Sequence, residues 1–405
     1  MNVLLSDGCG LASRQAARLL HQAGHRVGVL TPDRLCVCGL TRTVHRVHLV
    51  PRAADGPDAW LEAAIAAYGD GYDVLLPTQE QVAVLSRHAD RLAAAGIRTV
   101  VPDFDAFAAV FDKVTARATL DRLGVPQPPS SVVTGVDEVE RYPVFAKLPV
   151  ATASSGVQRV SSAAELTALI ATWRAEGRLT DGPILAQEPA DGPLAMVQAV
   201  FDHGRLVAAH VNERVREGIG GGASHKRSLD RPDAVESISR LGTGLGWHGA
   251  LSADVILAAD GPLVIDVNPR LVEPANAAAS GVDLVGPLVE LATGGTPTRQ
   301  RPSRPGVRTH QTLLAVLGTA DRTGTRRAVA REAFAALRHR GAYEASTEEL
   351  TPLRGNWRGT APTVAAAVMS LISPSLHRRF VSGSTDAYAL GPAAWATLLD
   401  GVPVT

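Results

Sequence analysis

Hydrophobic residues in the first hundred positions alternate between short apolar runs and longer amphipathic stretches. Apolar runs at 3–5, 27–30, 73–77 and 98–101 predict buried strands, and the spacing at 13–23, 60–68 and 79–95 predicts helices between them. Strands that alternate with helices form a parallel sheet with right-handed crossovers. We therefore expect an N-terminal α/β domain over residues 1–110.

The pattern becomes mixed in the middle of the chain. A predicted helix over 113–123 is followed by prolines at 126, 128 and 129, which mark a linker. Strands are then expected at 144–148, 184–187 and 195–201, and helices at 163–176 and 232–245. The predicted fold class combines α/β and α+β units, with a second domain over residues 111–295.

A segment rich in Pro, Gly, Thr and Arg (292–310) marks the start of a mainly helical C-terminal domain over residues 296–405. Ten arginines lie between 299 and 340, against only Asp321 and Glu332. A nucleic-acid surface is conceivable, but the segment 326–340 has an ordinary buried face and no run of interleaved aromatic residues. That face consists of Val329, Ala333, Ala336 and Leu337. We interpret the arginines as a solvated helix face and expect no nucleic-acid partner.

Composition excludes several classes of protein. The 405 residues carry 40 basic and 40 acidic side chains, a balance that argues against a protein devoted to binding phosphate backbones. Three cysteines are too few for a disulfide framework, and Cys36-x-Cys38 lacks a second ligand pair for zinc. Neither a signal peptide nor an apolar run of membrane-spanning length is visible. We expect a soluble cytoplasmic protein without a membrane partner.

The turn Gly8-x-Gly10-x-x-Ser13 follows a strand and opens a helix, as a dinucleotide-binding turn would. Its third position is serine, however, and Asp33 lies in a Pro-Asp turn. Glycine-rich first turns also occur in α/β domains that bind no cofactor. We therefore interpret this turn as structural.

The most informative segment is 254–270, DVILAADGPLVIDVNPR. Its alternating apolar residues predict two strands joined by a three-residue loop, Ala259-Asp260-Gly261. A loop centred on Asp260 would place Asp254 directly opposite Asp266, with Asn268 on the same face. Opposed like charges destabilise a hairpin, so we expect a cation between them.

Two carboxylates and an amide oxygen are hard ligands that suit Mg²⁺ shared with substrate phosphates. Arg270, two residues beyond Asn268, is then in position to hold a phosphate or a developing oxyanion. The alternative is an exposed hairpin whose acids are merely solvated. That alternative does not explain the match in register or the Asn-Pro-Arg sequence after a buried strand.

The chain contains only three lysines, at 113, 147 and 226, among 37 arginines. Such a bias suggests that lysine remains where a compact ammonium is needed and a planar guanidinium fits poorly. Chance survival is the competing explanation, so the lysines need independent placement.

These segments together resemble the ATP-grasp superfamily, in the carbamoyl-phosphate-synthetase-like and amino-acid-ligase branch. The 254–270 hairpin is similar to the family's metal-binding hairpin, whose second strand ends in Glu-x-Asn-x-Arg. Three further matches occur in the family's order: Asp112-Lys113 at a helix start, Pro143–Lys147 and Ile184–Glu188. The resemblance implies an N-terminal Rossmann-like pre-ATP-grasp domain and a two-lobed ATP-grasp domain whose lid covers about 130–200.

The resemblance also implies roles for individual residues. Lys113 and Lys147 would contact nucleotide phosphates, and the loop Ser154, Ser155 and Gly156 would cover them. Gln187, Glu188 and Ala190 would lie at the adenine, Asp254, Asp266 and Asn268 would hold metal, and Arg270 and Lys226 would be catalytic. The implied cofactors are ATP and Mg²⁺, with two ions expected and Mn²⁺ as a substitute.

The sequence departs from the family pattern in three places. The phosphate-covering loop 152–156 has one glycine, both metal acids are aspartates where glutamate is common, and Pro193-Leu194 replaces a ribose-binding glutamate. The implied function is an ATP-dependent carboxylate–amine ligase that forms an amide or peptide bond through an acyl phosphate. Small-molecule carboxylates and amines would be its partners, and a homodimer is compatible with it. A carboxyphosphate-dependent carboxylase and a catalytically degenerate nucleotide-binding scaffold are the alternatives.

Two regions could contact substrate. The loop from Gly220 to Lys226 would either close over the acyl group or be an ordinary surface loop. Four polar residues follow strand ends and could face substrate, but we favour the interpretation that they satisfy turns and caps. They are Thr78, Glu80, Glu273 and Asn276.

Overall fold

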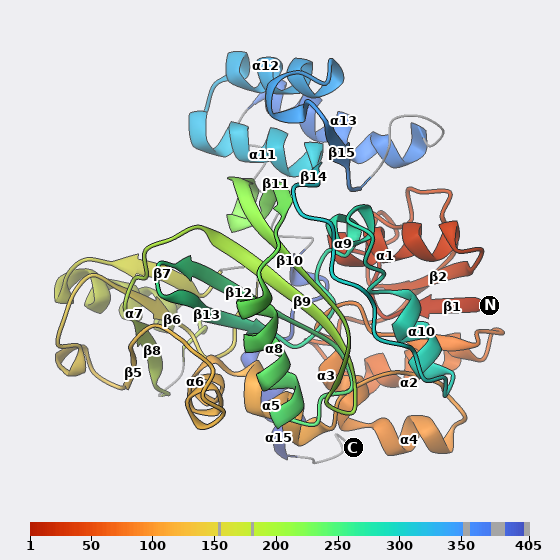
Figure 1. Cartoon of the computed structure of the whole chain (residues 1–405), viewed down its shortest axis with the longest axis horizontal. Helices are drawn as coiled ribbons and strands as arrows, with labels where there is room; N and C mark the ends of the chain where they lie inside the picture. The colour runs from red at the N-terminus through yellow and green to blue at the C-terminus, as the bar shows by residue number, and fades with distance from the viewer. Residues whose placement is uncertain (153–154, 180–181, 351–356, 374–384, 401–405) are drawn as a thin grey trace.

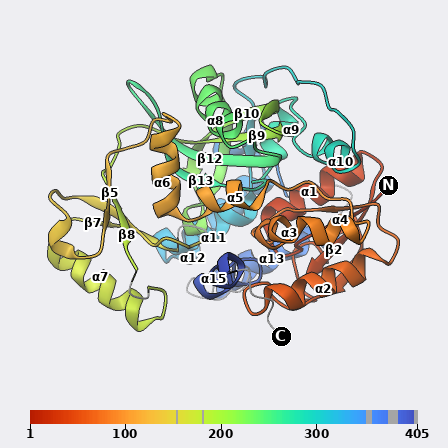
Figure 2. The ribbon, with the colours of Figure 1, turned by 90° about the horizontal axis from the view of Figure 1, so that it is seen from below.

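A computed structural model of the chain describes residues 1–152, 155–179, 182–350, 357–373 and 385–400 (Figure 1). These residues form two four-stranded sheets and one seven-stranded sheet. Figures 1 and 2 show one four-stranded sheet projecting with its helix to one side of the molecule. Within the described ranges, no helix has the length and hydropathy that crossing a membrane requires.

The N-terminal sheet is parallel, as expected for alternating strands and helices. Its strands are β1 (Asn2–Leu5), β2 (Arg26–Thr31), β3 (Val44–Leu49) and β4 (Val74–Leu76), in the order β3-β2-β1-β4. The apolar residues of β1 and β4 are fully buried because helices cover both faces of a parallel sheet. The run 98–101 is not a strand, and only the Arg98 carbonyl accepts a bond from this sheet, from Leu75 N at 2.9 Å.

Five helices accompany this sheet: α1 (Leu11–Gln22), α2 (Pro57–Tyr68), α3 (Val82–Arg87), α4 (Ala89–Ala94) and α5 (Phe104–Phe111). The single helix expected over 79–95 is split in two. The break lies at His88, whose φ of −111° and ψ of 25° leave the helical region.

The glycine turn after β1 is filled by a side chain of the protein. The Asp7 carboxylate accepts bonds from the N–H groups of Cys9 (3.0 Å) and Gly10 (2.6 Å) and from the Ser13 hydroxyl (2.7 Å). A Cβ on Gly10 would lie 1.9 Å from Gln79 Nε2, so this glycine serves close packing. The donors that would bind a dinucleotide phosphate are already occupied, which supports the structural interpretation of the turn.

The projecting sheet follows α6 (Lys113–Arg122) and the proline linker. It is antiparallel, with strands β5 (Ser130–Val133), β6 (Val144–Lys147), β7 (Val157–Val160) and β8 (Ile184–Gln187) in the order β5-β8-β6-β7. Helix α7 (Ala163–Ala175) covers it, and a separate core forms around Leu166, Trp173 and Ile184. This sheet therefore packs as a unit with its own core, and it contains most of the residues that we expected to form a lid.

The expected lid limit of residue 200 needs correction. Strand β9 (Leu194–Asp202) pairs with β10 (Arg205–Glu217) and β12 (Gly249–Ala258) in the seven-stranded sheet. The lid sheet therefore ends at Gln187. Sequence alternation identified the strand at 195–201 but could not indicate which sheet it joins.

The seven-stranded sheet has the order β13-β12-β9-β10-β11-β14-β15. Its remaining strands are β11 (Ala223–Ser228), β13 (Gly261–Asn268), β14 (Arg308–His310) and β15 (Ser346–Glu348). Helix α8 (Pro232–Gly244) packs on β9, β10, β12 and β13, while α9 (Ala275–Ala279) and α10 (Gly286–Ala292) follow the hairpin. The long central strands β9, β10 and β12 form the middle of this sheet (Figure 1).

Residues 296–405 are less uniformly helical than expected. Helices α11 (Thr312–Thr323), α12 (Arg326–Leu337), α13 (Trp357–Ile372) and α15 (Pro392–Asp400) are present, but β14 and β15 extend the large sheet. Helix α15 returns to the N-terminal part, where the Trp395 ring packs at a tilt against Phe111 of α5, with 4.7 Å between the ring centroids. On α12, Val329 and Ala336 are buried as expected, but Leu337 is 63% exposed, which corrects its predicted place in the core.

Candidate active site

The hairpin of β12 and β13 places Asp254 opposite Asp266, as predicted, although by a different route. A two-residue turn joins the strands, because Ala258 pairs with Gly261. This turn shifts the register near the tip by one residue from the predicted one. Ile265 is then an extra residue on β13, and this bulge restores the predicted pairing of the two aspartates.

The strand register places Asp254 and Asp266 on a polar face of the large sheet. Side chains of directly paired residues lie on the same face. One row of paired residues crosses five strands: Asp266, Asp254, Met196, Asn212 and Ser228. The neighbouring row consists of Asn268, Ser252, Gln198 and His210.

The two aspartates have different electrostatic partners. Lys113 Nζ lies 3.0 Å from Asp266 Oδ1, and Asn268 Nδ2 donates to Asp254 Oδ2 at 3.2 Å. Burial and the charge of Asp266 raise the pKa of Asp254 to about 6. One lysine therefore lies beside two acids, and a bound cation would relieve their remaining repulsion.

Lys147 connects the lid to this hairpin. Its ammonium donates to Gln187 Oε1 at 2.7 Å and to the main-chain oxygen of Ile265 at 2.6 Å. The side chain is 4% exposed, and burial lowers the pKa of Lys147 to about 8. A compact ammonium thus occupies a narrow place between two lid strands and the bulged residue of β13.

The predicted adenine segment leads out of the lid. The Gln187 side chain is buried and turned toward Lys147, whereas Glu188 and Ala190 are half-buried. The Glu188 N–H donates to the Pro129 carbonyl at 2.8 Å, which ties the segment to the proline linker. The segment thus links the lid to β9 with its main chain anchored at one point.

The loop expected to cover phosphates is anchored at its first residue. Ser154 lies outside the described residues. The Thr152 hydroxyl donates to Glu80 Oε1 at 2.6 Å, and the Ser155 main-chain oxygen accepts a bond from Arg178. A Cβ on Gly156 would lie 2.3 Å from the Ala151 Cβ, so the single glycine allows the loop to close tightly.

Arg270 lies close to Asp266 and Asn268 at the end of the hairpin. It lines a small pocket together with Lys113, Asp266 and Asn268. In the described part of the chain its guanidinium makes neither a hydrogen bond nor an ion pair, although its charge lowers the pKa of Asp254. An unpaired, half-buried guanidinium is suited to binding an anion.

Lys226 occupies a different position from the one expected. The expected closing loop is a short 3₁₀ turn (Ile219–Gly221) followed by β11, and Lys226 lies within that strand between β10 and β14. Its ammonium contacts Glu273 and also Glu349, the latter at 2.8 Å. Burial lowers the pKa of Lys226, but the two carboxylates outweigh burial and raise it above its usual value.

Sequence reasoning missed Glu349, which organises this buried cluster. It is 0% exposed and accepts bonds from Lys226, from Gln311 Nε2 (2.9 Å) and from Thr309 Oγ1 (2.6 Å). Glu349 follows a three-residue strand in the last part of the chain, where no motif marks it. Glu273 adopts a left-handed φ of 34°, and such strain in a non-glycine residue often accompanies a functional site.

The other polar residues near strand ends are satisfied within the protein, as we favoured. Thr78 shares a hydrogen bond of 2.8 Å with Ser13. Glu80 accepts the N–H of Leu390 at 2.6 Å in addition to the Thr152 hydroxyl, and Asn276 Oδ1 lies 2.8 Å from His210 Nε2. Glu80 nevertheless links the lid loop to the C-terminal segment.

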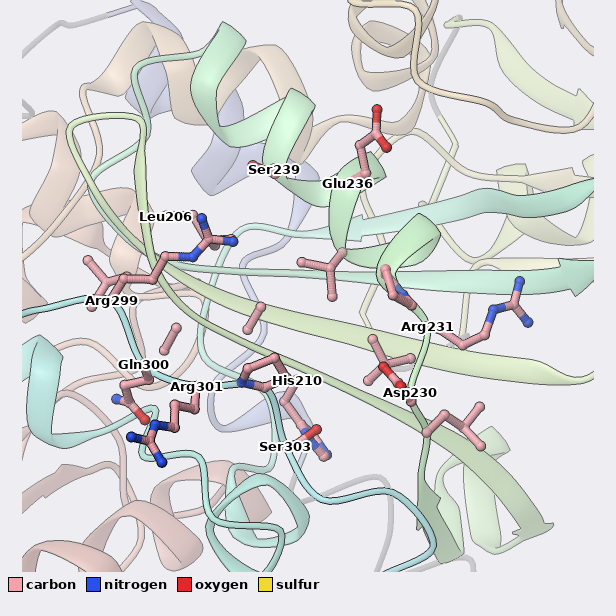
Figure 3. Close-up of a pocket in the computed structure, with 18 residues that line it drawn as sticks. Leu206, His210, Asp230, Arg231, Glu236, Ser239, Arg299, Gln300, Arg301 and Ser303 are labelled. Carbon is pink, nitrogen blue, oxygen red and sulfur yellow. The ribbon is translucent and has the colours of Figure 1, made fainter.

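A separate cavity of about 360 Å³ lies along residues 206–211 of β10 (Figure 3). Asp230, Arg231 and Glu236 line it from the β11–α8 side, and residues 299–303 line it from the opposite side. None of the predicted site residues that the structure describes takes part in it. The chemistry-bearing residues gather instead around the β12–β13 hairpin.

The residues at the hairpin fit a magnesium–nucleotide ligand. Asp254, Asp266 and Asn268 offer the oxygen donors that Mg²⁺ prefers, on adjacent strand positions of one face. Lys113, Lys147 and Arg270 supply positive charge around them, which suits a polyphosphate.

The comparisons with known proteins identify the family of the domain that contains this site. Residues 110–274 match the family model of the ATP-grasp domain. This part of the chain is therefore an ATP-grasp domain, which confirms the resemblance found in the sequence, and members of that superfamily are ATP-dependent ligases. The matched range contains the antiparallel lid sheet and the β12–β13 hairpin.

One curated relative matches most of this chain. The carbamoyl phosphate synthase large chain of Thermomicrobium roseum is 27% identical over 325 residues, which cover 75% of this chain and 29% of the relative. The chain thus spans less than a third of that relative's length.

Two solved structures share the fold. The biotin carboxylase domain of Hydrogenobacter thermophilus 2-oxoglutarate carboxylase, in complex with MgADP and bicarbonate, gives a TM-score of 0.60 at 17% identity and covers 76% of this chain and 73% of its own. The L-amino acid ligase of Bacillus licheniformis gives a TM-score of 0.56 at 15% identity. The match covers 73% of this chain and 75% of the ligase chain. At these identities the likeness shows the fold alone.

Proposed function

We propose that the protein is an ATP-dependent carboxylate–amine ligase that forms an amide or peptide bond and releases ADP and phosphate. The carrying observation is the grouping of Lys113, Asp266, Asn268 and Arg270 around one pocket, with Asp254 paired to Asp266. Cations and oxygen ligands in this arrangement suit phosphoryl transfer between two anionic reactants.

The reaction would proceed in two balanced steps. A carboxylate oxygen attacks the γ-phosphorus of ATP, the bond to the β–γ bridging oxygen breaks, and ADP leaves. An amine nitrogen then attacks the acyl carbon of the acyl phosphate and loses a proton, and the C–O bond to phosphate breaks with its electron pair. Mg²⁺, when bound, would neutralise charge on the phosphates and the attacking carboxylate.

Each predicted residue has a proposed task in these steps. Lys113 and Lys147 would bind phosphates, and the loop with Ser154, Ser155 and Gly156 would exclude water from them. Gln187, Glu188 and Ala190 would border the adenine, while Asp254, Asp266 and Asn268 would hold one or two metal ions. Arg270 would stabilise the acyl phosphate and the tetrahedral oxyanion.

Lys226 is proposed to act from within the sheet rather than from a mobile loop. Its contacts with Glu273 and Glu349 keep it protonated and already compensate its charge, so it would act by fixing the Glu273 carboxylate rather than by binding a substrate anion itself. We also propose the domain division 1–110, 111–295 and 296–405, a cytoplasmic location and a homodimeric state. The Hydrogenobacter domain is described as a dimer, which supports the last of these.

The test is ADP release with Mg²⁺ and a panel of carboxylates, each with and without an amine. Release that requires both reactants supports the ligase. Release that depends on bicarbonate would instead favour a carboxylase that works through carboxyphosphate. Nucleotide binding without ADP release by any reactant would indicate a scaffold protein. Asp266→Asn serves as the inactive control, and Asp260→Asn at the exposed hairpin turn serves as the matched active control.

A further inference from the structure

A cavity of about 820 Å³ lies beside the candidate active site, and neither the sequence motifs nor the family match accounts for it. It is enclosed by the end of β6, the 3₁₀ turn at 219–221, helix α11 and the C-terminal residues 385–392. The volume is within the range of about 300–1,000 Å³ that is typical of small-molecule sites.

The wall of this cavity is mainly apolar. Leu313 and Leu317 of α11, Leu148 and Val150 after β6, and Leu390 near the C-terminus all line it. Arg178, Asp321 and Asp386 also line the cavity, but away from them a charged or strongly polar group against the leucine wall would lose its hydration without compensation. An apolar group would instead gain the free energy of leaving water.

One part of the cavity wall is shared with the candidate active site. Ala151 and Thr152 line both the cavity and the pocket that contains Lys113, Asp266 and Arg270. Glu273, the partner of Lys226, also lines the cavity. A molecule in the cavity can therefore place its reacting end at the phosphate-binding region and its other end against α11.

We propose that this cavity binds the side chain of the carboxylate substrate, and that this substrate carries a bulky apolar group such as a large aliphatic or aromatic side chain. The inference rests on the proposed ligase function and names the substrate class for the same site. The carboxylate would lie at the shared wall near Thr152, within reach of the pocket with Arg270. The apolar group would lie between Leu313, Leu317 and Leu390.

Ala389 offers a direct way to fill the cavity. It lines the cavity and its own side chain is small and half-buried, so Ala389→Phe should take up space with little change to the core. Leu313→Ala changes the opposite wall and removes apolar contacts. Ala330→Phe, at an exposed position of α12, is the matched control for adding a phenyl group elsewhere.

Binding is measured first, by calorimetry with Mg²⁺ and a non-hydrolysable ATP analogue, using phenylalanine and alanine as probes. Phenylalanine should bind the wild type at least about tenfold more tightly than alanine does. Ala389→Phe and Leu313→Ala should each remove most of that preference, and Ala330→Phe should keep it. ADP release with the same two amino acids should show the same order in kcat/KM.

The outcomes separate this inference from the proposed function. Small or polar carboxylates could bind and support ADP release as well as phenylalanine does, with Ala389→Phe changing neither property. That result would support the ligase and contradict the apolar substrate site. If Ala389→Phe weakens phenylalanine binding but no carboxylate supports ADP release, the apolar substrate site is supported and the ligase function is contradicted. If neither amino acid binds at millimolar concentration, in the wild type or in Leu313→Ala, the proposal that the cavity binds an apolar side chain is wrong.

Discussion

Lys147 of the lid donates a hydrogen bond to the main-chain oxygen of Ile265, the bulged residue of β13. The bulge therefore restores the pairing of Asp254 with Asp266, and its own carbonyl receives the lid lysine. The same ammonium bonds Gln187 at the end of β8. A single side chain thus joins the β12–β13 hairpin, the lid and the start of the segment that we propose borders the adenine.

Replacement of this lysine should weaken nucleotide binding. Lys147→Ala removes one of the two ammonium groups that we expect at the phosphates. Lys147→Arg introduces a planar guanidinium, which fits the narrow site poorly. We expect a loss of ATP-analogue affinity of about tenfold to a hundredfold, in line with hydrogen bonds that involve a charged group. Calorimetry measures it, with exposed Arg338→Ala as the control. Equal affinity in Lys147→Ala and the wild type would place the lysine outside the nucleotide site.

The hairpin acids should be needed for the ligand rather than for the fold. Asp266→Asn loses the ion pair with Lys113 but relieves the repulsion on Asp254, so the melting temperature without metal should change little. The additional melting shift caused by Mg²⁺ and ATP analogue should disappear, and ADP release should fall by about a hundredfold or more.

Asp260→Asn is the control for that experiment, because Asp260 lies in the exposed turn of the same hairpin. It should keep both the melting shift and the turnover. A full ligand-induced shift in Asp266→Asn would mean that the metal is held by other residues.

The lid should become protected when nucleotide binds. Residues 130–187 have their own small core and are joined to the rest of the chain by the proline linker and the segment after Gln187. Hydrogen exchange over this range should slow on addition of Mg²⁺ and ATP analogue, because closure excludes water from the phosphates. Strand β9, which belongs to the central sheet, serves as the internal control. Unchanged exchange in the lid with bound nucleotide would argue against closure.

The buried His210 should make the protein sensitive to acid. Burial lowers the pKa of His210 to about 4, against about 6.5 in an unfolded chain. The unfolded state therefore binds more protons between these two values, so the free energy of unfolding should fall as the pH drops from about 6.5 to about 4. One such group accounts for at most about 3 kcal/mol.

Urea unfolding at several pH values compares the wild type with His210→Gln. Buried His225 and His310 shift in the same direction and are present in both proteins, so the difference in slope isolates His210. The variant should lose less stability on acidification than the wild type. Parallel pH profiles would show that His210 is free to protonate in the folded protein.

Local patterns predicted the pairing of Asp254 with Asp266 because strand pairing near a tight turn depends on counting residues. The predicted loop was one residue too long, and the bulge at Ile265 cancelled the error. Nothing in the alternation of apolar residues signals that bulge. The lysines at 113 and 147 were found from the family order, whereas their contacts with Asp266 and Ile265 required the fold.

Contacts between distant segments were beyond the sequence pattern. Strands β14 and β15 have three residues each, too few for a period-two signal, and Glu349 meets Lys226 only through their pairing. The exposure of Leu337 had the same origin, because helical periodicity gives a face but not where the neighbouring elements end.

The pairing of β11 with β14 has a practical consequence for working with this protein. The family match ends at residue 274, but β11 takes its outer neighbour from residues 308–310. A fragment trimmed to the match would leave that strand with an open edge, which invites pairing between chains, and would deprive buried Lys226 of Glu349. Such a fragment should self-associate, because the residues that complete the sheet and the Lys226 cluster extend beyond the range that the family model matches.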